Sequence, residues 1–168
     1  MREDPPNVPD RRGGVNSPRA KEWVRRVNPE LDRAYRSTSY QVMVPGEPPL
    51  ELRIGVRSAG LDALLTRWGS ERWAFITGWN PASRLRSPEE NRARHAELVE
   101  AVIAGGWRHY PGAGVPDRAG WAPEDSLLVL DISRAEAVAL GRRFGQRAIL
   151  VGRNGEAPDL VYLAEQGE

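Results

Sequence analysis

Apolar and polar residues alternate in two short segments near the start of the chain, 39–44 and 50–56. Alternation with a period of two is typical of a strand that buries one face and exposes the other. Residues 45–49, which lie between the segments, include three prolines and one glycine and favour a turn. The pattern therefore predicts a β-hairpin with one face in water.

Residues 73–77 form an apolar run without alternation, which indicates a central strand buried on both faces. Four further segments are expected to be strands, and Asn154-Gly155 between the last two is a strong hairpin-turn signal. These segments are 107–110, which a glycine- and proline-rich loop follows, then 126–130, 147–152 and 159–163.

Helix-start signals precede two amphipathic segments. Ser87 is followed by proline and, three residues later, by Glu90, and Ser133 stands in the same relation to Glu136. The first helix should run to about Ala104 before a glycine pair, and the second should end at a glycine at position 145. Shorter helices are expected over 60–68 and, in two pieces broken near residue 28, over 18–36.

The order of elements predicts one mixed α/β (α+β) fold, with a mixed sheet flanked by helices in a single compact domain over residues 37–168. Residues 17–36 are expected to form a helical arm. Residues 1–16 contain three prolines and almost no apolar side chains, so we expect a disordered tail there.

Composition excludes several classes of function. The chain of 168 residues has 24 basic and 23 acidic residues, a net charge of +1, so a nucleic-acid partner is not expected. It has no cysteine and two histidines, so we expect no metal site, and no motif calls for a cofactor. No apolar segment approaches the roughly 20 residues of a membrane span, and none follows the first residues as in a secretory signal. We therefore expect a cytoplasmic protein.

Candidate chemistry lies where the buried strand ends. In the helix after Ser87, the apolar stripe through Leu98 and Val102 continues backwards, at helical spacing, to His95 and Asn91, so it turns polar beside the strand end. Ligands of open α/β sheets collect at such ends. We therefore expect a pocket for a small polar or anionic ligand, formed by Thr77, Trp79, Asn80, Ser83, Asn91 and His95.

The same residues also fit a purely structural role. Asn80 precedes a proline and is suited to fixing a turn, and Asn91 can bond to its own backbone. Trp79 and His95 are equally consistent with the core. Spacing alone leaves both interpretations open.

Glu124 is the candidate acid/base residue. It stands just before an apolar strand, where partial burial would raise its pKa and suit it to proton transfer. The competing interpretation is an ion pair with one of the many arginines.

Several short motifs occur in a fixed order along residues 30–165. They are Ala34-Tyr35-Arg36 with Tyr40, Phe75 to Pro81, Ser87 with Glu90-Asn91-Arg92, Gly112 and Gly114, Trp121 with Pro123, Glu124 and Ser126, and Phe144-Gly145-Gln146 with Ala148. With these motifs the chain resembles a bacterial family known as a domain of unknown function, number 3293.

The resemblance implies no activity, but it adds Trp121, Ser126 and Gln146 to the expected ligand site. Gly78 departs from the alanine typical of the family, and His95 stands where the family has a different residue.

Two functions follow from the sequence. The first is the binding of a small polar ligand in a pocket at the end of the strand over residues 73–77. The protein would be an enzyme if Glu124 acts there as acid/base. The alternative is a non-catalytic protein-interaction module that uses the arm and exposed aromatic residues such as Trp23, since tryptophan is enriched at interface hot spots.

Overall fold

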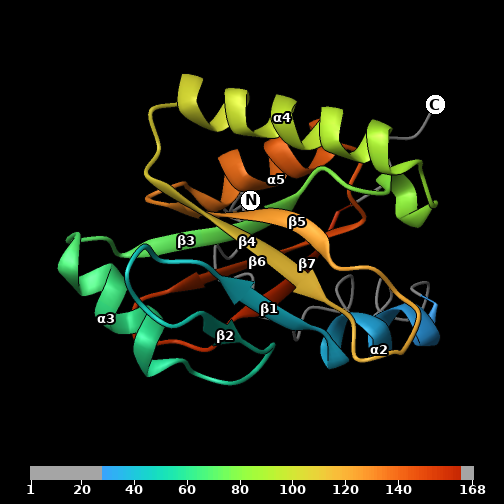
Figure 1. Ribbon diagram of the computed structural model, residues 1–168. Helices are drawn as coiled ribbons and strands as arrows, with labels where there is room; N and C mark the ends of the chain where they lie inside the picture. Colours follow the sequence, from blue (N-terminus) through green and yellow to red (C-terminus); the bar gives the residue numbers. More distant parts are fainter. Residues whose placement is uncertain (1–27, 164–168) are drawn as a thin grey trace, which may run out of the picture. The chain divides into compact units, whose positions relative to one another are not determined.

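The computed structural model describes residues 28–163 (Figure 1). The expected tail, residues 1–16, and residues 17–27 of the expected arm, with Trp23, lie outside this range. The chain divides into two compact units, Met1–Arg33 and Ala34–Glu168. The first described helix begins in the first unit, and the other described elements lie in the second.

The elements follow the expected order closely. They are α2 (Pro29–Ser37), β1 (Ser39–Val42), β2 (Leu50–Leu52), α3 (Ala59–Arg67), β3 (Arg72–Thr77), the short 3-10 helix η1 (Pro81–Ser83), α4 (Pro88–Ala104), β4 (His109–Val115), β5 (Glu124–Leu130), α5 (Arg134–Arg143), β6 (Ala148–Arg153) and β7 (Asp159–Tyr162).

The predicted helix starts are confirmed. The Ser87 hydroxyl accepts a hydrogen bond from the Glu90 N–H at 3.1 Å, which caps α4. At α5 the cap is reciprocal, because Ser133 Oγ accepts from the Glu136 N–H and the Glu136 carboxylate accepts from the Ser133 N–H. These bonds satisfy N–H groups that the first turn of a helix leaves free.

The seven strands form one sheet in the order β2-β1-β4-β5-β3-β6-β7. The mixed α+β class is confirmed, but every neighbouring pair is antiparallel, where we expected a mixed sheet. Helix α4 carries the chain back along the sheet, so β4 runs in the same direction as β3. Strand β5 is inserted between them and bonds to both, which leaves no parallel neighbours.

Strand β3 is buried on both faces, as predicted. Ala74 and Ile76 pack in a core beneath α4 and α5, whereas Trp73 and Phe75 belong to a second core that includes the leucines of α3. Figure 1 shows α4 and α5 over one side of the sheet and α3 on the other.

Strand β4 extends to Val115, so the loop expected after residue 110 is wrong at its start. Gly112 pairs with Val42 of β1 and with Ser126 of β5. A Cβ at Gly112 would lie 2.4 Å from the Gln41 carbonyl oxygen. Here glycine allows a close approach between strands rather than marking a loop.

Candidate functional site

The antiparallel register gathers three strand ends at one end of the sheet. Thr77, the last residue of β3, pairs with Ser126 near the start of β5, and β3 also pairs with β6. The loop after β3, Glu124 and Gln146 therefore come together, although they are far apart in the chain. An antiparallel pairing thus forms the site, not the parallel strand ends that the sequence argument assumed.

The loop after β3 has an unusual backbone. Asn80, Ala82 and Ser83 have left-handed φ angles of 44°, 56° and 56°. Non-glycine residues adopt this conformation at a cost and only where their surroundings impose it. The Ala82 N–H donates to the Gly145 carbonyl at 2.7 Å, which fixes the loop to the turn between α5 and β6.

Asn80 and Asn91 hold each other. The Asn80 N–H donates to Asn91 Oδ1 at 2.9 Å, and Asn91 Nδ2 donates to Asn80 Oδ1 at 3.0 Å. Asn80 Oδ1 also accepts from the Arg86 N–H. Asn91 is buried, and these bonds already satisfy its side-chain oxygen and nitrogen. Both side chains therefore connect the loop after β3 to the first turn of α4.

Glu124 is the remaining partner of Asn80. Asn80 Nδ2 donates to Glu124 Oε1 at 2.7 Å, and the other carboxylate oxygen, Oε2, has no hydrogen-bond partner within residues 28–163. Burial raises the pKa of the Glu124 carboxyl above its ordinary value, and the Asn80 hydrogen bond opposes that rise in part. No arginine within residues 28–163 forms an ion pair with Glu124, so the competing interpretation has no support in this part of the chain.

Two tyrosines and an arginine that were not predicted from the sequence also lie at this site. The Tyr40 hydroxyl donates to the Tyr35 carbonyl at 2.9 Å. Burial raises the pKa of the Tyr35 hydroxyl, the Ser83 hydroxyl lowers it, and the charges of Glu124 and Arg147 act on it in opposite directions. Ser83 and Glu124 therefore lie within electrostatic reach of Tyr35, as does Arg147.

Arg147 is also buried in part, and its Nε is enclosed without a hydrogen-bond partner in the described part of the chain. Such a donor is rare in a folded protein and calls for an explanation. The signal for Tyr35 and Tyr40 was present in the family motif around residues 34–40, whereas no local pattern marks Arg147.

Other predicted residues fix the site's framework. Thr77 Oγ1 donates to the Asp125 carbonyl at 2.7 Å, and Ser126 Oγ donates to the Glu124 carbonyl at 3.0 Å. Gln146 Nε2 donates to the Trp79 carbonyl at 3.0 Å. The indole N–H of Trp79 is buried and has no hydrogen-bond partner among residues 28–163. All four side chains are part of the local structure at this end of the sheet.

No hydrogen bond or ion pair within residues 28–163 joins His95 or Trp121 to Glu124. His95 lies on the same face of α4 as Leu98 and Val102. These two residues are part of the core between the sheet and helices α4 and α5. Glu124, at the start of β5, lies on the same face of the strand as Ser126 and Leu128. Leu128 belongs to the core on the other side of the sheet. Trp121 is 55% exposed in the segment before β5, with no side-chain hydrogen bond among the described residues.

Arg94 is a structural residue that the sequence argument missed. Its Nε donates to the Gly78 carbonyl at 2.8 Å, and one terminal nitrogen donates to the Phe144 carbonyl at 2.6 Å. The two bonds tie α4 to the segments that follow β3 and α5. They stabilise the end of the sheet that carries Glu124.

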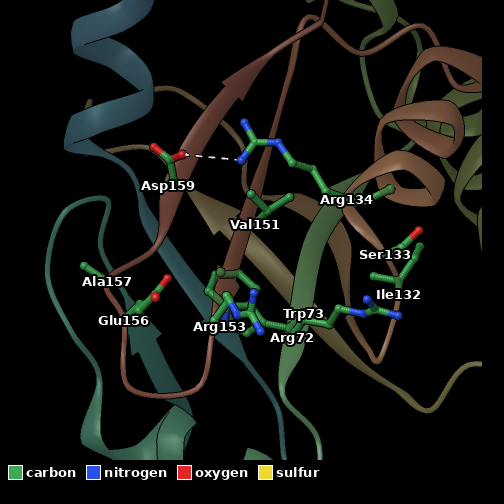
Figure 2. Close-up of a pocket in the computed structure, with 12 residues that line it drawn as sticks. Arg72, Trp73, Ile132, Ser133, Arg134, Val151, Arg153, Glu156, Ala157 and Asp159 are labelled. Carbon is green, nitrogen blue, oxygen red and sulfur yellow. Dashed lines mark ion pairs between the residues drawn. The ribbon is translucent and has the colours of Figure 1, made fainter. Parts of the chain in front are cut away.

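A cavity of about 290 Å³ lies at the opposite end of β3, and no predicted site residue lines it (Figure 2). Within residues 28–163 no three acidic or histidine side chains are grouped as metal ligands would be. Over the same range, no helix has the length and apolar character needed to cross a membrane.

Comparison with known proteins gives one family. Residues 76–149 match the model of "Protein of unknown function (DUF3293)". The resemblance expected from the sequence is thereby confirmed over this range, which includes β3, the Asn80 loop, α4, Glu124 and Gln146. Neither the curated proteins nor the solved structures gave a match.

Gly78 lies close to α4. A Cβ at this position would lie 3.0 Å from the Arg94 carbonyl oxygen, so an alanine here requires a small shift of α4 relative to β3.

Proposed function

We propose that this protein binds a small polar ligand at the carboxyl end of β3 and that Glu124 exchanges a proton with it. One observation carries the proposal. Glu124 is a half-buried carboxyl with a raised pKa, held at Oε1 by Asn80 while Oε2 has no partner among the described residues. A carboxyl kept in this condition holds its proton to a higher pH than an exposed one, which suits it to proton transfer.

The surrounding groups define the ligand's chemistry. Arg147 Nε and Trp79 Nε1 are enclosed donors without acceptors among residues 28–163, and Tyr35 adds a hydroxyl within the electrostatic reach of Glu124. Enclosed donors of this kind favour a ligand that brings acceptor oxygens. A small hydroxylated or carbonyl-containing molecule fits this set. Asn80 and Asn91 then act as positioning residues, since their own polar groups are already bonded.

Thermal unfolding of the purified full chain against a panel of polar metabolites tests the proposal. Three proteins are compared: the wild type, Glu124→Gln and Glu100→Gln. Glutamine at 124 keeps an oxygen for Asn80 but cannot exchange a proton. Glu100 is exposed on α4 and serves as the matched control.

We expect at least one compound to raise the Tm of the wild type and of Glu100→Gln. A compound present at 100 times its Kd adds about 2.7 kcal/mol to the free energy of unfolding. The same compound should raise the Tm of Glu124→Gln much less. An equal shift in all three proteins, or no shift in any of them across the panel, contradicts the proposal.

The alternative function, a protein-interaction module, has no specific support within residues 28–163, since residues 17–27 of the arm lie outside them. It stays a prediction, as does the cytoplasmic location. Loss of a co-purifying protein on deletion of residues 1–27 would favour it.

A further inference from the structure

The cavity at the amino end of β3 has a charged rim and an apolar floor. Figure 2 shows it between the ends of β3 and β6, the start of α5 and the turn before β7. Its apolar lining comes from Ile132, Ala137 and Val151, and its rim is formed by charged side chains. A cavity of about 290 Å³ is large enough for a small organic molecule.

Two arginines on its rim are direct neighbours across the sheet. Arg72 of β3 and Arg153 of β6 are register partners in an antiparallel pair, and both line the cavity. Like charges placed opposite each other in this way destabilise a sheet. Neither arginine has an ion pair in the part of the chain that the structure describes. Figure 2 shows their long side chains diverging along one edge of the cavity.

The acidic residues nearby do not neutralise this pair. Asp159 faces Arg134 across the cavity at 3.9 Å, and Glu156 has no ion pair among the described residues. The Glu136 carboxylate is already engaged by the Ser133 N–H, which lowers its pKa more than the nearby charge of Arg72 does. Among the residues that line the cavity, three arginines stand against two acidic residues, Glu156 and Asp159.

We propose that this cavity binds a small anion through Arg72 and Arg153, with a phosphate or carboxylate group as the recognised chemistry. The guanidinium group is suited to such oxygens because it presents several N–H donors in a fixed plane. A bound anion also removes the repulsion between the two arginines. The site is independent of Glu124, because the five residue steps from Arg72 to Thr77 span roughly 16 Å of strand.

NMR titration of the isotopically labelled full chain at low ionic strength tests this inference. Inorganic phosphate and acetate are added separately, and the Nε–H signals of Arg72 and Arg153 are followed. The two probes distinguish a phosphate site from a carboxylate site. Variants Arg72→Gln and Arg153→Gln are compared with the control Arg142→Gln, whose side chain is exposed at the other end of α5.

We expect at least one anion to shift both signals, and each glutamine at 72 or 153 to weaken its Kd about tenfold or more. Without anion, the same two variants should have a higher Tm than the wild type, because the like-charge contact is gone. A structural role alone would not produce this pair of opposite effects. Shifts that Arg72→Gln and Arg153→Gln leave unchanged, or no saturable shift with either anion, overturn the inference.

Discussion

Asn80 combines a left-handed backbone with side-chain bonds to the Arg86 N–H, to Asn91 and to Glu124. The sequence identified Asn80 because asparagine before proline is a turn signal. It could not show that one amide group would serve both the loop and the acid/base candidate. That dual role depends on β5, which arrives 44 residues later in the chain.

Substitutions of Asn80 separate the contribution of its side-chain hydrogen bonds from that of its backbone conformation. Asn80→Ala loses the side-chain bonds and leaves an alanine at positive φ, so we expect a loss of about 2–3 kcal/mol in the free energy of unfolding. Asn80→Gly loses the same bonds but accepts the backbone angle, so its loss should be smaller by about 1 kcal/mol. Urea denaturation measures both. Equal losses would show that the φ of 44° carries no strain.

Glu124 should make stability depend on pH. Its pKa is raised in the folded state, so the folded protein binds the proton more tightly than the unfolded chain. This contribution to stability is complete below the ordinary value of 4.5 and is lost as the pH rises through the folded-state pKa.

Glu124→Gln removes the cost of burying the charge and keeps the Asn80 hydrogen bond. We therefore expect this variant to be more stable than the wild type at neutral pH and to approach it below about pH 4. Denaturation at several pH values checks this, with Glu100→Gln as the control. A variant less stable than the wild type at neutral pH would show that the carboxylate is stabilising.

At the scale of elements, local signals predicted most of the fold. Ser87 and Ser133 mark their helices because capping is decided within four residues. Asn154-Gly155 marks its hairpin for the same reason. The extension of β4 and the insertion of β5 between β3 and β4 were not predicted, because strand pairing depends on segments that are distant in sequence.

The two glycines of β4 provide a matched test of strand approach. A Cβ at Gly112 would meet the Gln41 carbonyl oxygen at 2.4 Å, whereas at Gly114 the nearest atom would be 3.8 Å away. We expect Gly112→Ala to cost about 1–3 kcal/mol of stability and Gly114→Ala to cost little. Thermal denaturation compares them. Similar Tm values for the two variants would contradict the packing described for β1 and β4.

At the scale of the whole domain, the two proposed sites occupy opposite ends of β3. Tyr35, Tyr40 and Arg147 were missed at the Glu124 site because they come from α2, from β1 and from the turn before β6. The arginine cavity was missed because no spacing in the sequence shows that residues 72 and 153 become neighbours. The sequence identified the loop and the carboxylate, and tertiary pairing supplied the rest.

This separation predicts independent energetics. Effects of distant substitutions on stability add to within about 0.5 kcal/mol. The double variant Glu124→Gln/Arg153→Gln should therefore change the free energy of unfolding by the sum of its single changes. A deviation well beyond that limit, measured by urea denaturation, would mean that β3 couples the two ends.

The central claim is that Glu124 is an acid/base group whose proton affinity is set by burial and moderated by Asn80. A pH titration of the Glu124 side-chain carboxyl carbon by NMR, in the wild type and in Asn80→Ala, tests it most directly. We predict a pKa above 4.5 in the wild type and a further rise in Asn80→Ala, because the Asn80 hydrogen bond lowers it. Titration of Glu124 at or below 4.5 in the wild type would contradict the account.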